Sequence, residues 1–145
     1  MKSLLSSLLL LALVCSCTSV PMASPQADAQ AKTFATQPGM CGLYVYRNEM
    51  YGMTNEFPVQ LDGRPLGTTG TKTFLFTWVA PGMHEVVTLA ERNSRIEIDA
   101  KAGALVYVWQ EVKADTQSKF AQLHQVEESK GQAGVRECKL AETKP

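Results

Sequence analysis

The sequence contains no cluster of positive charge. Its 14 Lys and Arg residues are matched by 14 Asp and Glu residues, and they are scattered along the chain. Nucleic-acid binding depends on clustered Lys and Arg that neutralise phosphates, and a broad electrostatic membrane-binding face needs similar clustering. The composition therefore argues against nucleic acid as a partner and against a basic membrane-binding face on the domain itself.

Motifs for catalysis and metal binding are also missing. The two histidines, His84 and His124, lie in no spaced metal motif, and there is no Gly-x-Ser-x-Gly sequence or glycine-rich phosphate loop. We therefore expect no enzyme activity, no metal and no cofactor. A triad of His84 with Ser94 or Ser118 stays open, because triads are assembled in space. Since His84 follows a Pro-Gly turn, we expect its ring to bond a backbone group there.

No apolar run approaches the roughly 20 residues that span a bilayer. The short run from Leu4 to Val14 follows Lys2 and ends in small residues, an order typical of a secretory signal peptide. The sequence up to Cys17 resembles the lipobox of bacterial lipoproteins, which implies a lipid on Cys17 as the new N-terminus. Ordinary signal-peptidase cleavage near Ser24 is the alternative.

The leader divides the chain into three predicted parts. Residues 1–16 form the lipoprotein signal peptide, residues 17–37 form a lipidated flexible tether, and residues 38–145 form one domain. The tether is rich in Ser, Pro, Gln and Ala, with few large apolar residues that could order it. Thr18 follows the lipidated cysteine without an Asp retention signal. By resemblance to Gram-negative lipoproteins, this implies the outer membrane, facing the periplasm, with the lipid as the membrane contact.

Two further cysteines, Cys41 and Cys138, flank the domain. In an exported protein such a pair predicts a disulfide. Two separate thiols are the alternative.

Alternating apolar residues predict many short strands. Segments 42–47 and 73–79 alternate between aromatic and aliphatic residues, and segment 95–99 has the pattern of a half-solvated strand. The nearly continuous apolar segment 104–109 predicts a central strand buried on both faces. The Asp62-Gly63 pair predicts a hairpin turn.

The C-terminal part is less regular. Segment 120–126 fits either a last strand or the start of a helix. Glu127 and Glu128 suit the first turn of a helix, and Gly131 and Gly134 weaken it. The pattern as a whole predicts an all-β fold, a small antiparallel sandwich of about seven strands with a short C-terminal helix.

Four segments together resemble the bacterial lipoprotein family called domain of unknown function 2846. They are Gly42-Leu43-Tyr44-Val45-Tyr46-Arg47, Leu61-Asp62-Gly63-Arg64-Pro65-Leu66-Gly67, Pro81-Gly82-Met83-His84-Glu85-Val86 and Ala102-Gly103 followed by Tyr107-Val108. The resemblance covers most of residues 41–140. It implies an extracytoplasmic β-sandwich domain and supplies no catalytic residues.

The segment after the first strand is the one unusual patch, and we single out Arg47, Met50, Tyr51 and Met53 as a possible binding loop. Its thioethers, with those of Met40 and Met83, could hold Cu(I), which prefers soft ligands; flexible apolar filling is the alternative. We therefore expect a lipid-anchored, non-enzymatic binding or accessory domain with an envelope protein or glycan as partner. A periplasmic Cu(I)-handling protein and a small hydrolase are the alternatives.

Overall fold

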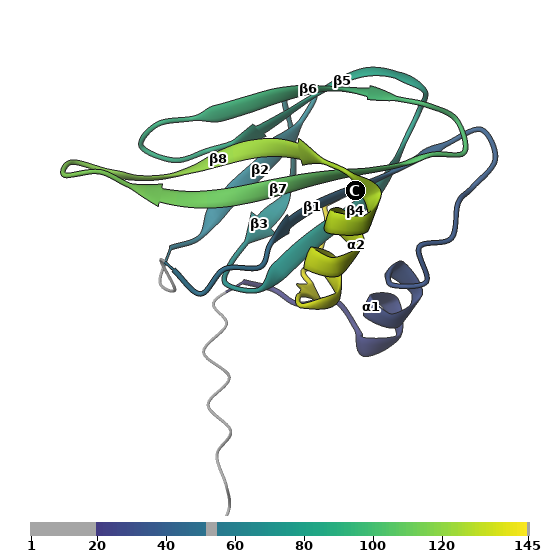
Figure 1. Cartoon of the computed structure of the whole chain (residues 1–145), viewed down its shortest axis with the longest axis horizontal. Helices are drawn as coiled ribbons and strands as arrows, with labels where there is room; N and C mark the ends of the chain where they lie inside the picture. Colours follow the sequence, from purple (N-terminus) through teal and green to yellow (C-terminus); the bar gives the residue numbers. More distant parts are fainter. Residues whose placement is uncertain (1–19, 52–54, 145) are drawn as a thin grey trace, which may run out of the picture.

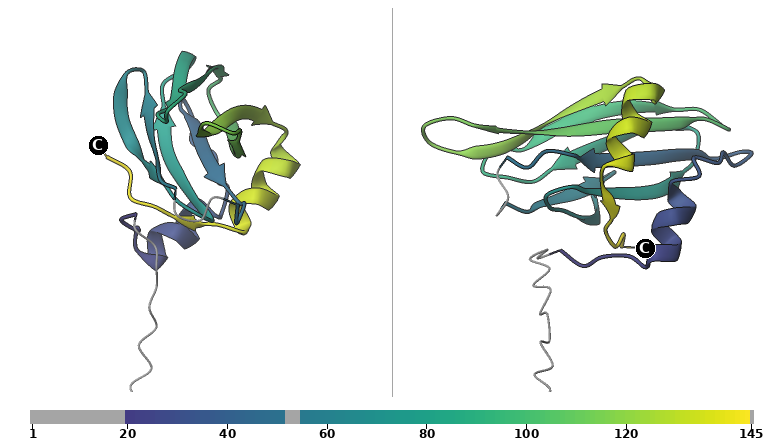
Figure 2. Two further views of the ribbon diagram at one scale, coloured as in Figure 1. Left: turned by 90° about the vertical axis from the view of Figure 1, so that its left-hand side faces the viewer. Right: turned by 60° about the horizontal axis from the view of Figure 1, so that its bottom comes forward.

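The structure is a computed structural model and describes residues 20–51 and 55–144. Within these residues the chain forms nine strands and two short helices. In chain order these are α1 (Pro25–Ala31), β1 (Cys41–Arg47), β2 (Phe57–Leu61), β3 (Arg64–Thr69), β4 (Thr73–Val79), β5 (Gly82–Thr88), β6 (Ser94–Ala100), β7 (Leu105–Ala114), β8 (Lys119–Val126), α2 (Glu128–Arg136) and β9 (Lys139–Leu140). A five-stranded sheet lies between a four-stranded sheet and the helices (Figures 1 and 2). This confirms the predicted all-β sandwich with a C-terminal helix.

The central strand of the five-stranded sheet is β1, whereas the sequence suggested segment 104–109. The strand order is β8-β7-β1-β4-β9, and every residue of β1 is buried. Leu43 and Val45 contribute to the core between the sheets, and Tyr44 and Tyr46 to the core beneath the helices. β1 runs antiparallel to β4 but parallel to β7. The sheet is therefore mixed, a departure from the antiparallel pairing predicted throughout.

The alternation within β1 and β4 separates two cores. Between the sheets the core is aliphatic, and it includes Leu43, Val45, Val59, Leu75, Val86, Ile98 and Val108. On the outer face of the five-stranded sheet, Tyr44, Tyr46, Phe74 and Tyr107 form an aromatic layer. The rings of Tyr44 and Tyr107 stack with their centroids 5.0 Å apart. The helices cover this aromatic layer.

The glycines that weaken the predicted C-terminal helix allow α2 to lie close to the sheet. A Cβ atom on Gly131 would lie 2.2 Å from Cγ of Tyr107, and one on Gly134 would lie 2.1 Å from Cε2 of Tyr46. Glycine costs about 1 kcal/mol relative to alanine inside a helix. In α2 the two glycines bring this cost, and they allow the helix to lie close to two buried rings.

Residues 20–37 are part of the folded domain, so the prediction of a flexible tether is wrong for this segment. Ser24 caps α1 by accepting a hydrogen bond from the Ala27 amide at 3.1 Å. Ala31 is buried, and its carbonyl accepts a 2.7 Å hydrogen bond from the Tyr44 hydroxyl. Partners distant in sequence order a segment whose own composition favours disorder. Residues 17–19 lie outside the described residues.

The two ends of the domain meet along one side of the sandwich. Met22 forms an antiparallel bridge with Ala141, and Gly67 of β3 forms one with Thr143. The side chain of Val20 is buried in the core between the sheets. We call this arrangement of residues 20–23 and 140–144 the terminal seam. It connects the four-stranded sheet to the β4–β9 side of the five-stranded sheet.

The predicted disulfide between Cys41 and Cys138 is wrong, since both cysteines are free and buried. Cys41 begins β1 and packs between the sheets, whereas Cys138 packs in the aromatic core on the other face. Sγ of Cys138 lies 3.3 Å from the carbonyl oxygen of Arg47, at the far end of β1. At about 3.3 Å per residue, β1 separates the thiols by roughly 20 Å, whereas the Cα atoms of bonded cysteines lie within about 7 Å.

Several local predictions are confirmed. The β2–β3 hairpin turns at Asp62 and Gly63, which both have positive φ. Segment 120–126 is a strand, within β8, and β6 alternates between exposed and less exposed residues at the edge of its sheet. No helix among the described residues is long and apolar enough to cross a membrane.

Candidate functional site

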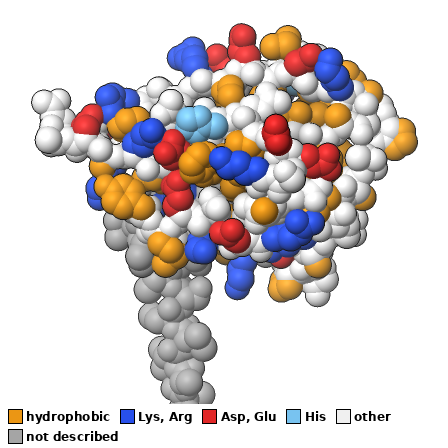
Figure 3. Space-filling view, viewed as in Figure 1, with side chains coloured by type: hydrophobic (Ala, Val, Ile, Leu, Met, Phe, Trp, Pro, Cys, Tyr) orange, Lys and Arg blue, Asp and Glu red, His pale blue; other side chains and the backbone are white. Residues whose placement is uncertain are grey.

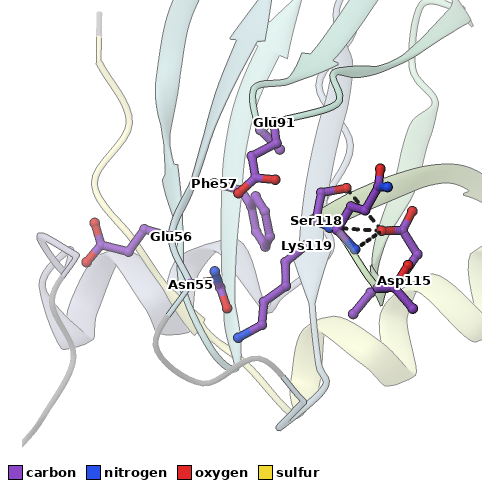
Figure 4. A pocket seen from close by; sticks show the side chains of 11 residues that line it. Asn55, Glu56, Phe57, Glu91, Asp115, Ser118 and Lys119 are labelled. Carbon is purple, nitrogen blue, oxygen red and sulfur yellow. Dashed lines mark hydrogen bonds between the residues drawn. The ribbon is translucent and has the colours of Figure 1, made fainter.

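A hollow lies at the end of the sandwich where three loops meet. The described residues of these loops are 48–51 with 55–56, 89–93 and 115–118, and the hollow has a volume of about 570 Å³. Its lining includes Asn55, Phe57, Glu91, Asp115, Ser118 and Lys119 (Figure 4). We call it the loop-end cleft. Each lining residue lies in a loop or within one residue of a strand end, so strand pairing sets the positions of the loops.

Two charged side chains fix the first loop to the sheet. Arg47, the last residue of β1, is fully buried. Its Nη1 donates to the carbonyl oxygen of Asn55 at 2.7 Å, and its Nη2 donates to that of Tyr51 at 3.1 Å. The carboxylate of Glu49 accepts a 2.8 Å hydrogen bond from the Val112 amide of β7. Both ends of the loop are therefore held in place.

The other two loops are joined to each other by an ion pair. The Asp115 carboxylate accepts backbone hydrogen bonds from Gln117 and Ser118 at 2.9 and 2.8 Å, and these lower the pKa of Asp115 below its usual value. The second carboxylate oxygen lies 2.6 Å from Nη2 of Arg92. Arg92 also lies over the Phe120 ring, 3.8 Å from its centroid. These contacts hold the two loops against each other.

The lining combines an apolar floor with polar groups on the walls. Phe57 is only 3% exposed and packs with Val112 and Ala121 beneath the cleft. Figure 4 shows the Glu91 carboxylate above Phe57 and the Lys119 side chain extending toward Asn55. Oδ1 of Asn55 is buried and has no hydrogen-bond partner among the described residues. The cleft can therefore offer charge, hydrogen bonds and an apolar contact to a ligand.

The predicted binding-loop residues differ in how exposed they are in the structure. Arg47 is a buried support for the loop and is unavailable to a ligand. Met50 and Tyr51 are 54% and 58% exposed on the loop. Met53 lies outside the described residues, as does the predicted lipidation site, Cys17.

Met50 lies at the opposite end of the sandwich from Met40 and Met83, the other described methionines considered for Cu(I). Met40 directly precedes β1 and Met50 follows it, so the length of the strand separates them. Met83 lies near the start of β5, at the opposite end from the loop-end cleft. Among the described residues, no group of three or more His, Cys, Asp and Glu residues is arranged to hold a metal ion.

His84 bonds a backbone group beside the Pro-Gly turn, as predicted. Its Nε2 lies 2.7 Å from the carbonyl oxygen of Ala80, and its Nδ1 lies 2.6 Å from the carboxylate of Asp62. Both ring nitrogens are engaged, so neither is free to activate Ser94 or Ser118. Ser94 Oγ instead accepts from the Leu123 amide, and Ser118 bonds to Asp115.

Sequence reasoning missed most of the cleft. Glu56, Glu91, Asp115 and Lys119 come from three parts of the chain, and each alone is typical of a solvated turn. Polar loops between the predicted strands are the sequence feature that could have indicated them. Figure 3 shows Lys, Arg, Asp and Glu residues interspersed over the face that it presents.

Comparisons with known proteins identify a family. The family model described as "Protein of unknown function (DUF2846)" matches residues 37–122. A curated protein of Haemophilus influenzae, described as "Uncharacterized protein", is 29% identical over 131 residues, covering 89% of this chain and 78% of that protein. No solved structure matches the chain.

Proposed function

We propose that this chain, which belongs to the DUF2846 family of proteins of unknown function, is a non-enzymatic binding or accessory domain. A lipid on Cys17 holds it at the bacterial cell envelope, in the outer membrane and facing the periplasm. The loop-end cleft is its binding site, and an envelope protein or glycan is its partner.

The preformed cleft is the observation that carries the binding part of this proposal. Arg47 and Glu49 hold one loop, and the Asp115–Arg92 pair joins the other two. A site that is ordered before binding avoids the entropic cost of ordering its loops on association. Sites on loops above a rigid sandwich are also a common arrangement for recognition. The cleft is open and largely polar, which suits a solvated segment of a larger partner.

The path of the N-terminal segment supports close attachment to the membrane. Val20 is buried in the domain core, three positions after the proposed lipidation site. An extended chain reaches at most about 3.6 Å per residue, so the lipid on Cys17 would lie within roughly 10 Å of the domain. The partner would therefore be met near the membrane surface.

Site-directed photo-crosslinking in intact cells tests the binding function. A photoreactive phenylalanine analogue replaces Thr116 in the cleft, and a matched control replaces the exposed Glu97 on β6. We expect a discrete crosslinked species from position 116 that is absent from position 97. Identical products from both positions, or no product from position 116, would contradict a binding site at the cleft.

A further inference from the structure

We infer that Met50 and Tyr51 form a second membrane contact beside the lipid on Cys17. Their side chains enter the headgroup region of the leaflet that holds the lipid, and this contact fixes the orientation of the domain on the membrane surface. This inference rests on the lipid anchor of the proposed function and goes beyond it. It follows from the place where the described chain begins and from the way the loop of residues 48–51 presents its side chains.

The described chain begins at the same end of the sandwich as this loop. Val20 is buried beside Gly70, where an added Cβ would lie 3.4 Å from Cγ2 of Val20. The Gly70 amide donates a 2.8 Å hydrogen bond to the Thr73 hydroxyl across the β3–β4 turn, and Thr73 pairs with Arg47, the last residue of β1. The loop therefore starts one strand away from the turn that Val20 contacts. Figure 1 shows both on the lower side of the sandwich.

The lengths of chain involved bring the loop and the lipid to one membrane surface. Three positions separate Val20 from Cys17, and an extended chain reaches at most about 3.6 Å per residue, so the lipid lies within roughly 10 Å of the buried Val20. Met50 is three residues beyond Arg47, and the same limit keeps it within roughly 11 Å of the end of β1. A membrane that holds the lipid therefore passes about one loop length from Met50 and Tyr51.

The loop exposes apolar side chains at this place. Of the described residues, the exposed large apolar ones are Met50, Tyr51 and Met83, at 54%, 58% and 63%, and two of these are neighbours on the loop. Tyrosine is enriched where membranes meet water, because its ring is apolar and its hydroxyl is polar. The flexible thioether side chain of methionine adapts to irregular apolar surroundings. The pair therefore has the chemistry of an interfacial membrane contact.

The rest of the loop is held against the domain. Asn48 and Glu49 are half-buried, and the Glu49 carboxylate accepts a hydrogen bond from the Val112 amide of β7. The buried Arg47 donates to the carbonyl oxygen of Tyr51 at 3.1 Å. The charge of Glu49 is thus engaged by the sheet, and the backbone beneath the two exposed side chains is fixed. An ordered loop loses little conformational entropy when its side chains enter a membrane.

Nitroxide spin labels, read by electron paramagnetic resonance, measure the depth of each side chain. The lipidated protein is reconstituted in vesicles of phosphatidylethanolamine and phosphatidylglycerol, as Met50→Cys or as the matched control Met83→Cys, which lies at the opposite end of the sandwich. Both domain cysteines are buried, so the introduced thiol takes the label. We expect the label at position 50 to lie about 5–10 Å into the boundary between headgroups and acyl chains, and the label at position 83 to lie in water.

A second substitution separates the contact from mere closeness to the lipid. With the label at position 50, Tyr51→Ser should move the label toward water, whereas Met83→Ser should leave its depth unchanged. A label at position 50 that stays in water, on protein that carries acyl mass and floats with the vesicles, would overturn the loop contact and leave the lipid anchor standing. It would point to a protein as the partner of the exposed pair. Equal depths at positions 50 and 83 would also overturn the contact. Protein that lacks acyl mass and leaves the vesicles would overturn the anchor and this inference together.

Discussion

His84 and Asp62 form an ion pair that joins two turns of the four-stranded sheet. Nδ1 of His84 lies 2.6 Å from Oδ2 of Asp62, while Nε2 lies 2.7 Å from the Ala80 carbonyl oxygen. Both partners are acceptors, so the ring satisfies them together only when each nitrogen carries a proton. The geometry therefore favours the imidazolium form of His84.

Stability should depend on pH through this pair. The Asp62 hydrogen bond, opposed by burial and aided by the Ala80 contact, raises the pKa of His84. Burial opposes the shift of Asp62, but hydrogen bonds from His84 and Glu85 and the charges of His84 and Arg64 together lower its pKa. The contribution of His84 to the free energy of unfolding is complete below the usual histidine pKa of about 6.5, and it is lost as the pH rises through the raised pKa of the folded protein. The contribution of Asp62 is complete above its usual pKa of about 4, and it is lost as the pH falls through the lowered pKa of the folded protein.

His84→Gln should therefore lower the free energy of unfolding most between about pH 4 and pH 6.5, by about 1 kcal/mol. The difference from the wild type should shrink at pH 9. Urea unfolding at several pH values measures it. A difference that does not change between pH 5 and pH 9 would contradict the charged pair.

Arg47→Met should loosen the loop of residues 48–56 and destabilise the fold. The substitution leaves the carbonyl groups of Asn55 and Tyr51 without their buried donor, at a cost of about 2–4 kcal/mol. Hydrogen exchange should accelerate in the loop, and urea unfolding should shift to lower concentration. The exposed Arg95→Met on β6 is the control. Unchanged exchange in the loop would show that Arg47 does not support the cleft.

Gly134→Ala should destabilise the protein even though alanine favours a helix. The propensity gain is at most about 1 kcal/mol, whereas the added Cβ meets the buried ring of Tyr46, and overpacking costs about 1–3 kcal/mol. We expect a lower melting temperature and changed chemical shifts at Tyr46. Ser129→Ala, on the exposed side of α2, should change little. A more stable Gly134→Ala variant would mean that α2 can move away from the sheet.

Strand positions could be predicted from the sequence because alternation is a local signal. Segments 42–47 and 73–79 each show which residues face which core. Pairing is not local, so the sequence placed segment 104–109 at the centre and missed the parallel alignment of β1 with β7. The same limit explains why the predictions of a disulfide and of a flexible tether were wrong. Cys41 and Cys138 flank the domain along the chain yet lie at opposite ends of one strand, and α1 is ordered by a tyrosine and by the C-terminal segment.

Both domain thiols should be free and unreactive in the folded protein. Burial is the largest cause that raises the pKa of Cys138, to about 12, with a further contribution from Glu137, and burial also raises the pKa of Cys41. Iodoacetamide at pH 8 should label neither residue until urea is added, after which it should label both. Dithiothreitol should leave the melting temperature unchanged. A melting temperature that falls on reduction would indicate a disulfide bond and would contradict two free thiols.

The mature protein should carry lipid on Cys17. Intact mass of membrane-extracted protein should show a chain beginning at Cys17 with added acyl mass, because several acyl chains anchor a protein stably and one does so only marginally. Cys17→Ala should remain unprocessed or leave the membrane fraction, whereas Cys15→Ala should be processed normally. A mature N-terminus at Ser24 without lipid would show ordinary secretion.

The terminal seam also determines when this protein can fold. Met22 pairs with Ala141, and Thr143 pairs with Gly67, so the sandwich closes on this side only after residues 141 and 143 have been synthesised. β1 likewise waits for β7, its parallel neighbour. Contacts between distant parts of a chain slow folding, and a nascent chain lacking them stays open. A chain still short of residue 141 therefore lacks both bridges of the terminal seam and leaves this side of the sandwich open.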